Sequence, residues 1–315
     1  MKLSVIAIVL SFVGTSANAA GLAEIKIPTD AKGRPAIDAV VWSPCAVAPK
    51  DISIQGSFPI PGVRDCSIEG TDLPLVMMSH GMGGNFASHF DVAESLADDG
   101  FIVVALTHVL DSGRDLKKAM DTSSMVERPT DVKRVMDYVL RSSKYRAVID
   151  SNRIGFFGFS RGGFTGLVLA GAVAKLPRTM DSLVDFAPGP PTLFRSPDQR
   201  IKVFVVADPL SLFPDKASLA EVTAPIQLWG SQFGGEGVRP KDVKAIADNL
   251  PTKPEFHVVP NAAHLSFLFP CPPAVAKAAH DICVDPPGFD RAAFHKRLDE
   301  QVVAFFAKHL KQNAH

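Results

Sequence analysis

The chain lacks an excess of either charge: its 315 residues include 33 Lys and Arg and 33 Asp and Glu. Proteins that bind nucleic acid or an anionic membrane surface usually carry a marked basic excess. The balance therefore gives no reason to expect either partner. The sequence also lacks internal repeats and any Gly/Ser-rich linker, which favours one large domain over two small ones.

The N-terminal apolar run is too short for a membrane anchor, since residues 5–13 fall well below the roughly 20 residues that a span requires. A lysine precedes the run, and Ala17 and Ala19 follow it in the small-residue pattern of a cleavage site. These features predict a secretory signal peptide, residues 1–19. No cysteine stands directly after the cut, which argues against a bacterial lipid anchor. We therefore expect residues 20–315 to form a single secreted or periplasmic domain without stable membrane insertion.

Cysteines are few, and no Cys/His cluster has the spacing of a zinc site, so the sequence indicates no metal. In an exported protein, four cysteines favour two disulfides. Three pairings are possible, and four free thiols are the alternative. We expect the local pairing, Cys45 with Cys66 and Cys271 with Cys283.

Residues 158–163 read Gly-Phe-Ser-Arg-Gly-Gly, between an apolar strand-like run and a small, apolar helical segment. Gly-x-Ser-x-Gly in that context is typical of the nucleophile elbow of an α/β-hydrolase, which this stretch resembles. Ser160 would sit on a strained turn, where Gly158 and Gly162 leave room for the crowded backbone. A glycine-rich turn that binds phosphate or only packs tightly is the alternative. We predict that Ser160 is a nucleophile.

A second glycine-rich turn, His-Gly-Met-Gly-Gly at residues 80–84, follows the continuous apolar run 72–79. Acyl transfer needs two backbone N–H donors for the oxyanion, one after the nucleophile and one from such an earlier loop. We predict the amides of Arg161 and Met82 as these donors. The alternative is a turn that only caps the following helix.

Strand-like runs alternate with amphipathic helical segments, which predicts a mostly parallel sheet with helices on both faces. Residues 109–127 and 176–198 are irregular and are expected near the rim of the site or over it. Pro129 is expected in the first turn of its helix. The predicted strands are 36–42, 72–79, 101–106, 152–157, 201–207, 224–230 and 255–259, and the predicted helices are 86–99, 129–140, 164–172 and 290–310.

A serine nucleophile needs a histidine base, and His264 is the histidine that directly follows the last predicted strand. His80 belongs to the glycine-rich turn, His108 precedes the elbow, and His257 lies inside a strand. The remaining histidines fall on helices or the tail and are expected at the surface or rim: His89, His280, His295, His309 and His315.

The carboxylate that orients the base is less clear from the sequence. The loop after residues 224–230 is the common place for it, but Gln232 stands where an aspartate is expected. Asp208 follows the preceding strand, at the edge where sites collect in open α/β sheets. We favour Asp208 over Glu236, with Asp215 third.

Together these motifs resemble the predicted dienelactone-hydrolase group related to platelet-activating-factor acetylhydrolase. The resemblance implies carboxylic-ester hydrolysis without a cofactor, on a small-molecule or lipid ester. In the acetylhydrolase relatives the acid follows the earlier strand, which supports Asp208. Enzymes called dienelactone hydrolase use a cysteine nucleophile, so Ser160 argues against the lactone activity itself.

The prediction is a two-step acyl transfer by Ser160, His264 and Asp208. Two other classes stay open, an amidase or peptidase with the same triad and a non-catalytic binding protein on the same scaffold. The Arg161 side chain either meets an anionic substrate group or, as we favour, pairs with a nearby carboxylate. The sequence does not indicate an oligomeric state.

Overall fold

The computed structural model describes residues 19–54, 58–113, 119, 122–176 and 192–311. The predicted signal peptide, except Ala19, and most of the predicted cover segment 176–198 lie outside the described residues. Within the described part of the chain, every helix is too short or too polar to cross a bilayer.

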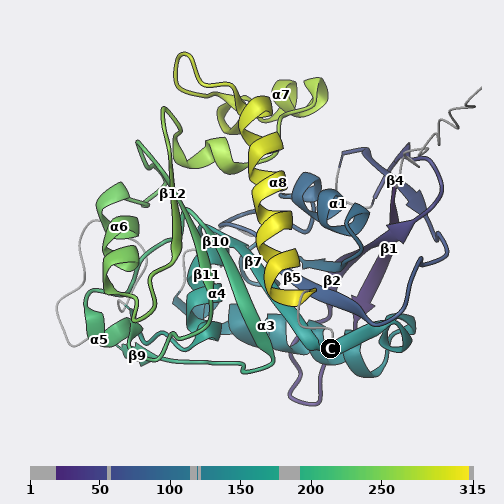
Figure 1. Cartoon of the computed structure of the whole chain (residues 1–315), viewed down its shortest axis with the longest axis horizontal. Coiled ribbons are helices and arrows are strands. Elements are labelled where there is room, and N and C mark those ends of the chain that lie inside the picture. Colours follow the sequence, from purple (N-terminus) through teal and green to yellow (C-terminus); the bar gives the residue numbers. More distant parts are fainter. Residues whose placement is uncertain (1–18, 55–57, 114–118, 120–121, 177–191, 312–315) are drawn as a thin grey trace, which may run out of the picture.

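A ten-stranded sheet organises the fold, in the order β12-β11-β10-β7-β5-β6-β2-β1-β4-β3 (Figure 1). The six strands from β12 to β6 are parallel, and the chain switches direction along the sheet between β5–β6 and β7. Antiparallel pairing of β2 with β6 and with β1 extends the sheet on one side. A separate antiparallel pair is formed by β8 and β9. The strands are β1 (Ala19–Ile27), β2 (Ile37–Cys45), β3 (Lys50–Ile52), β4 (Ile60–Arg64), β5 (Leu73–Ser79), β6 (Ile102–Leu106), β7 (Ile149–Phe159), β8 (Ala174–Leu176), β9 (Thr192–Phe194), β10 (Ile201–Ala207), β11 (Ile226–Ser231) and β12 (Glu255–Val259).

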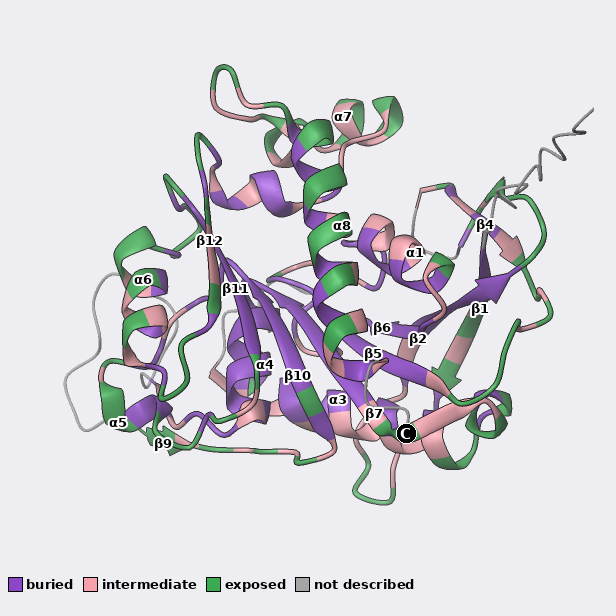
Figure 2. Ribbon diagram, in the orientation of Figure 1, coloured by how far each residue is buried: buried purple, intermediate pink, exposed green. Residues whose placement is uncertain are grey.

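Helices cover both faces of the sheet, so the central strands are buried on both sides (Figure 2). Successive β5 side chains alternate between the two cores: Leu75 and Met77 pack on the α3 and α4 face, and Val76 and Met78 on the α1 and α8 face. This is why the strand reads as a continuous apolar run. The helices are α1 (Phe90–Asp98), α3 (Thr122–Arg141), η1 (Lys144–Ala147), α4 (Arg161–Ala170), α5 (Lys216–Leu219), α6 (Pro240–Asn249), η2 (His264–Phe267), α7 (Pro273–Ala278), η3 (His280–Cys283) and α8 (Arg291–Leu310).

The starts of helices α3 and α1 differ most from the sequence prediction. Helix α3 begins at Thr122, so Pro129 lies inside it rather than in its first turn. Proline costs the helix one backbone hydrogen bond, but Met125 and Arg128 are buried on the preceding turn and hold it in place. Helix α1 begins at Phe90 instead of residue 86, because the preceding polar side chains bond the backbone locally, as Asn85 does with the N–H of Ala87.

Both predicted disulfides are confirmed. Cys45 bonds to Cys66 and Cys271 to Cys283, and no cysteine is left free. The first links the end of β2 to the loop after β4. The second closes the segment that contains α7 and η3.

Candidate active site

Ser160 lies on the turn between β7 and α4, at the carboxyl edge of the central strands. Its backbone has φ 56° and ψ −115°, a left-handed conformation that a residue with a side chain rarely adopts. A Cβ atom at Gly158 or Gly162 would collide with neighbouring backbone, at Gly162 O and Ser79 O respectively. The two glycines therefore permit the sharp turn that the sequence pattern predicted.

His264 and Asp208 form a buried pair at the same edge of the sheet. The Nδ1 atom of His264, at the start of η2, lies 2.7 Å from Oδ2 of Asp208, directly after β10. Ser231 at the end of β11 donates to both carboxylate oxygens, its N–H to Oδ1 and its hydroxyl to Oδ2, each at 2.8 Å. Because Asp208 is fully buried and accepts these three bonds, its carboxylate is held in one orientation.

The ring of His264 faces the nucleophile turn. It stacks on the ring of Phe159, the residue before Ser160, with centroids 4.6 Å apart. Ser160 and His264 line one cavity of about 510 Å³, together with Met82 and Arg161. The structure therefore brings the predicted nucleophile and base to a common cavity, with Asp208 behind the base.

The other carboxylates considered from the sequence have different surroundings. Glu236 lines the cavity but is exposed, and the contact with Nδ1 of His264 is made by Asp208. Asp215 accepts from the N–H of Ser218 at 2.9 Å and so caps the short helix α5. It also pairs with Lys175 at 2.8 Å. Gln232, in the place where an aspartate was expected, accepts from the N–H of Asn261 at 2.7 Å and so ties down the loop that carries His264.

The two amides predicted for the oxyanion also lie at this cavity. Arg161 is the first residue of α4, whose first helical bond runs from Phe164 N–H to the Ser160 carbonyl, so the Arg161 N–H has no partner within the helix. At the glycine-rich turn, the Gly81 carbonyl accepts from the N–H of Gly84 at 3.2 Å and from Nδ1 of His80 at 2.6 Å. A trans peptide directs its N–H away from its carbonyl, so these two bonds also set the direction of the Met82 N–H.

His80 is locked as a neutral ring. Its Nε2 accepts from the N–H of His108 at 3.0 Å, which leaves the proton on Nδ1, toward Gly81 O. Burial, followed by the charge of Arg128, lowers the pKa of His80 well below 6.5. The ring therefore keeps donating to the turn across the neutral pH range.

A buried charge cluster lies behind the glycine-rich turn, and the sequence analysis missed it. Asp111 accepts from Arg128 at 2.7 Å, from the Arg161 side chain at 3.2 Å and from Gly83 N–H at 3.2 Å. Arg128 also donates to the His80 carbonyl. Although burial raises it, the two arginines hold the pKa of Asp111 at about 2. The polar stretch around Asp111 gave no periodic signal by which this cluster could have been recognised.

The Arg161 side chain belongs to this cluster and is not directed at a substrate group. Arg161 is 2% exposed, and its guanidinium group pairs with Asp111, as we favoured from the sequence. It also donates to the Ala119 carbonyl at 2.5 Å.

Two histidines that we expected at the surface or rim are buried instead. His89 precedes α1 and His295 lies on α8, and they are 4% and 2% exposed. The prediction was wrong because it placed both on solvent-facing helix sides, whereas α1 and α8 pack against each other over the sheet (Figure 1). His315 lies outside the described residues.

Comparison with known proteins assigns the fold. The family model described as "Dienelactone hydrolase family" matches residues 67–282, more than half of the chain. Among solved structures, the chain is similar to a ferulic acid esterase from Streptomyces cinnamoneus, with 16% identity, a TM-score of 0.68, and coverage of 96% of this chain and 92% of that one. No curated protein matches significantly. The predicted α/β-hydrolase fold is thus confirmed, whereas the link to platelet-activating-factor acetylhydrolase stays a prediction.

Proposed function

Because the chain belongs to the dienelactone hydrolase family, we propose that it is a serine hydrolase of carboxylic esters. The observation that carries the proposal is the 2.7 Å contact between His264 and Asp208, at the cavity that Ser160 also lines. Ser160 is the nucleophile, His264 the general base and Asp208 the residue that orients the base. The chemistry uses these side chains and water, without a cofactor.

The reaction proceeds in two acyl transfers. Ser160 Oγ attacks the ester carbonyl while its proton passes to Nε2 of His264, and Asp208 stabilises the resulting imidazolium. The tetrahedral intermediate collapses, the proton moves to the leaving alkoxide, and the alcohol departs. Water then attacks the acyl-enzyme with His264 as base, and the acid leaves as Ser160 regains its proton.

The amides of Met82 and Arg161 stabilise the oxyanion in both steps. Such donors act best when they are already aimed before the substrate arrives. The His80 and Gly84 bonds to the Gly81 carbonyl aim one amide, and the start of α4 aims the other. Losing one donor of this kind typically costs about 2.7 to 4 kcal/mol of transition-state stabilisation.

The cavity favours a neutral ester with an apolar acyl or alcohol group. Its charged lining groups include Glu236 and Asp281, which repel an anionic substrate. The Arg161 guanidinium is already paired with Asp111. Apolar side chains form most of the remaining wall: Phe58, Phe159, Leu210, Leu265, Leu268, Phe269, Val275 and Ile282.

We further propose that the mature protein acts outside the cytoplasm. Two disulfides support this location, because such bonds persist in oxidising compartments. The N-terminal residues 1–19 supply the matching export signal. The protein would then meet esters in the periplasm or the medium.

Substituting the nucleophile tests the proposal. We expect Ser160→Ala to lower kcat for p-nitrophenyl acetate by at least about 10⁴-fold, since a triad without its serine loses nearly all its triad-dependent rate. A fluorophosphonate probe should label the wild-type protein and not the variant. Circular dichroism and a thermal melt serve as the folding control. Retained turnover, or equal labelling of both proteins, would remove Ser160 from its proposed role.

A further inference from the structure

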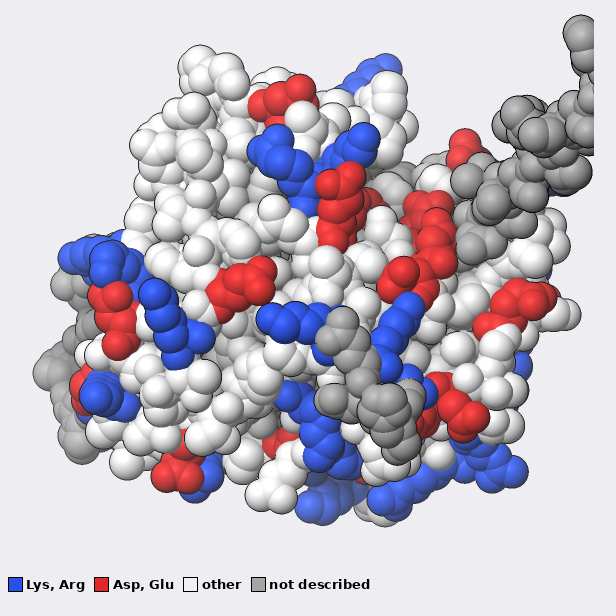
Figure 3. Space-filling model, in the orientation of Figure 1, with Lys and Arg blue, Asp and Glu red and all other residues white. Residues whose placement is uncertain are grey.

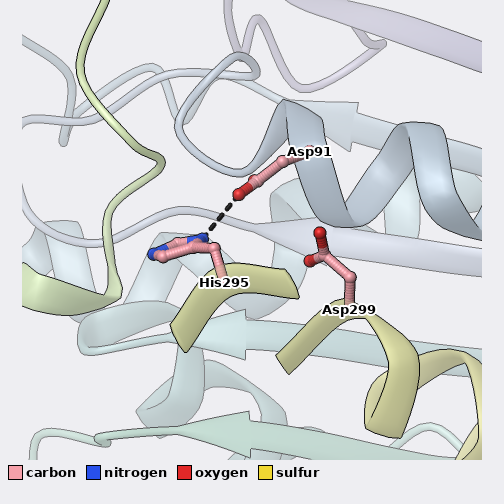
Figure 4. A group of neighbouring side chains, drawn as sticks. All are labelled: Asp91, His295 and Asp299. Atoms are coloured by element: carbon pink, nitrogen blue, oxygen red, sulfur yellow. Dashed lines mark hydrogen bonds and ion pairs between the residues drawn. The ribbon is translucent and has the colours of Figure 1, made fainter. Parts of the chain in front are cut away.

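Three potential metal ligands meet between α1 and α8, outside the candidate active site. Asp91 comes from the first turn of α1, and His295 and Asp299 come from neighbouring turns of α8 (Figure 4). One ligand atom from each lies within 4.8 Å of the others. Zinc bonds to N and O are about 2.0 to 2.2 Å long and usually tetrahedral, so two ligands of one ion stand roughly 3.5 Å apart. To hold one ion, the side chains would shift and the 2.5 Å contact between Nδ1 of His295 and Asp91 would open.

The hydrogen bonds of His295 leave one ring nitrogen directed at the carboxylates. Its Nε2 lies 3.1 Å from the carbonyl of Ser266, which only accepts, so Nε2 carries a proton. Its Nδ1 faces Oδ2 of Asp91 at 2.5 Å. Metal-binding histidines commonly donate their second N–H to a backbone carbonyl in this way, which fixes the ring and frees the other nitrogen for the ion.

Each carboxylate of the cluster has one oxygen that the described part of the protein leaves without a partner. Among the described residues, Oδ1 of Asp91 and Oδ1 of Asp299 are buried and have no hydrogen-bond partner. Burying a carboxylate oxygen without a donor or a cation is costly, so two such atoms beside one imidazole point to a missing positive charge. This observation is independent of the spacing of the three ligands.

The surroundings add negative charge and give access from solvent. Acidic side chains gather on the surface where α1 and α8 meet (Figure 3). An open surface cavity of about 400 Å³, also lined by Ser95 and Asp98, reaches Asp299 and gives an ion a path.

We propose that Asp91, His295 and Asp299 bind a divalent transition-metal cation, with Zn²⁺ as the best match to one imidazole and two carboxylates. The ion replaces the direct contact between His295 and Asp91 and takes solvent as its remaining ligands. The site could not be recognised from the sequence, because its residues are separated by about two hundred positions and show no zinc spacing. It joins α1 to α8 and, through the Ser266 carbonyl, to the η2 segment that begins with His264.

Calorimetric titration of the full chain tests the site without reference to ester hydrolysis. After dialysis against EDTA, we expect Zn²⁺ to bind wild-type protein at one equivalent, with Mn²⁺ weaker and Ca²⁺ weakest because an imidazole ligand suits the transition metals. Asp299→Asn keeps the side-chain shape and should weaken Zn²⁺ binding at least about tenfold. The matched control is Glu300→Gln, which removes one negative charge from the next, exposed residue and should leave the affinity within about twofold.

Thermal melts give the second measurement. Zn²⁺ should raise the Tm of the wild-type and Glu300→Gln proteins and not that of Asp299→Asn, because only binding to the folded state stabilises it. The Tm of the EDTA-treated Asp299→Asn protein shows whether that variant is folded. Equal Zn²⁺ binding by wild-type and Asp299→Asn protein would mean an adventitious ion only, and no stoichiometric binding of any of the three ions would equally overturn the proposal.

Discussion

Two of the His–Asp pairs in the described part of the chain are fully buried and look alike in isolation, His264 with Asp208 and His108 with Asp131. In each, Nδ1 faces a carboxylate oxygen, at 2.7 Å and 3.1 Å respectively. The difference lies at the other ring nitrogen. Nε2 of His108 is 2.9 Å from the Ser79 hydroxyl inside the fold, whereas the ring of His264 lines the cavity beside Ser160. A carboxylate orients both rings, but only access to a substrate makes such a pair useful as a base.

Among the changes that test this comparison, removing the charge of Asp208 should have the largest effect. In Asp208→Asn, the amide oxygen can keep the bond from the Ser231 N–H at the Oδ1 position. The amide NH₂ then faces Nδ1 of His264 and forces the ring proton onto Nε2, so the ring cannot accept the proton of Ser160. We expect kcat for p-nitrophenyl acetate to fall about 10³- to 10⁴-fold, as when a triad aspartate becomes asparagine.

Glu236→Gln is the matched control for this experiment, because it removes an exposed carboxylate from the rim of the same cavity. Its kcat should stay within about threefold of wild type. If Glu236→Gln lost more activity than Asp208→Asn, the pairing seen between His264 and Asp208 would not be the catalytic one.

Neutralising Asp111, in the buried charge cluster behind the glycine-rich turn, should lower the stability of the fold. Asp111→Asn can still accept from the Gly83 N–H, but two buried guanidinium groups, Arg128 at 2.7 Å and Arg161 at 3.2 Å, lose their counter-charge. Breaking a buried ion pair from one side costs about 3 to 5 kcal/mol, and we expect this loss in the free energy of unfolding measured with urea.

The comparison for Asp111 is an exposed ion pair changed in the same way. Asp248 lies 2.6 Å from Lys244 on the surface of α6, and Asp248→Asn should cost less than about 1 kcal/mol. Equal losses from the two variants would show that the Asp111 cluster contributes no more to stability than a surface pair.

The nucleophile turn was predicted from a local sequence pattern, Gly-x-Ser-x-Gly between two apolar runs. Glycines at 158 and 162 are required by the close approach of backbone around Ser160, and the apolar runs on either side form β7 and α4. His264 was selected by its place after the last parallel strand, since the carboxyl ends of such strands share one edge. These choices needed only chain order and the geometry of parallel strands.

The remaining features depend on contacts between distant residues. Asp208 and Glu236 both follow central strands, and only the paths of their loops decide which carboxylate meets His264. His295 was misread because its partners, Asp91 and the Ser266 carbonyl, come from other elements. Strands β1 and β4 were not predicted, although β1 pairs along its full length with β2. Polar networks and edge strands are therefore where this sequence was least informative.

The smallest predicted effect concerns the pH dependence of stability, and it sharpens the contrast between the two pairs. Burial raises the pKa of Asp131 from 3.8 to about 6. Between these two values the folded protein holds a proton that the unfolded chain has released, so the free energy of unfolding falls as the pH rises through this window. Asp131→Asn cannot titrate, and it should remove on the order of 3 kcal/mol of that fall.

Urea unfolding at several pH values between about 4 and 7 measures how the free energy of unfolding changes with pH in the wild-type and Asp131→Asn proteins. Other carboxylates with raised pKa values, such as Glu94 and Asp98, titrate in both proteins and cancel in the difference. Burial, and then Arg128, lower the pKa of His108 well below 6.5, so its ring is neutral near pH 7, at the upper end of this range. If the free energy of unfolding changed equally with pH in the two proteins, Asp131 would titrate as an ordinary surface carboxylate. The His108–Asp131 pair would then not be shielded from solvent as the structure implies.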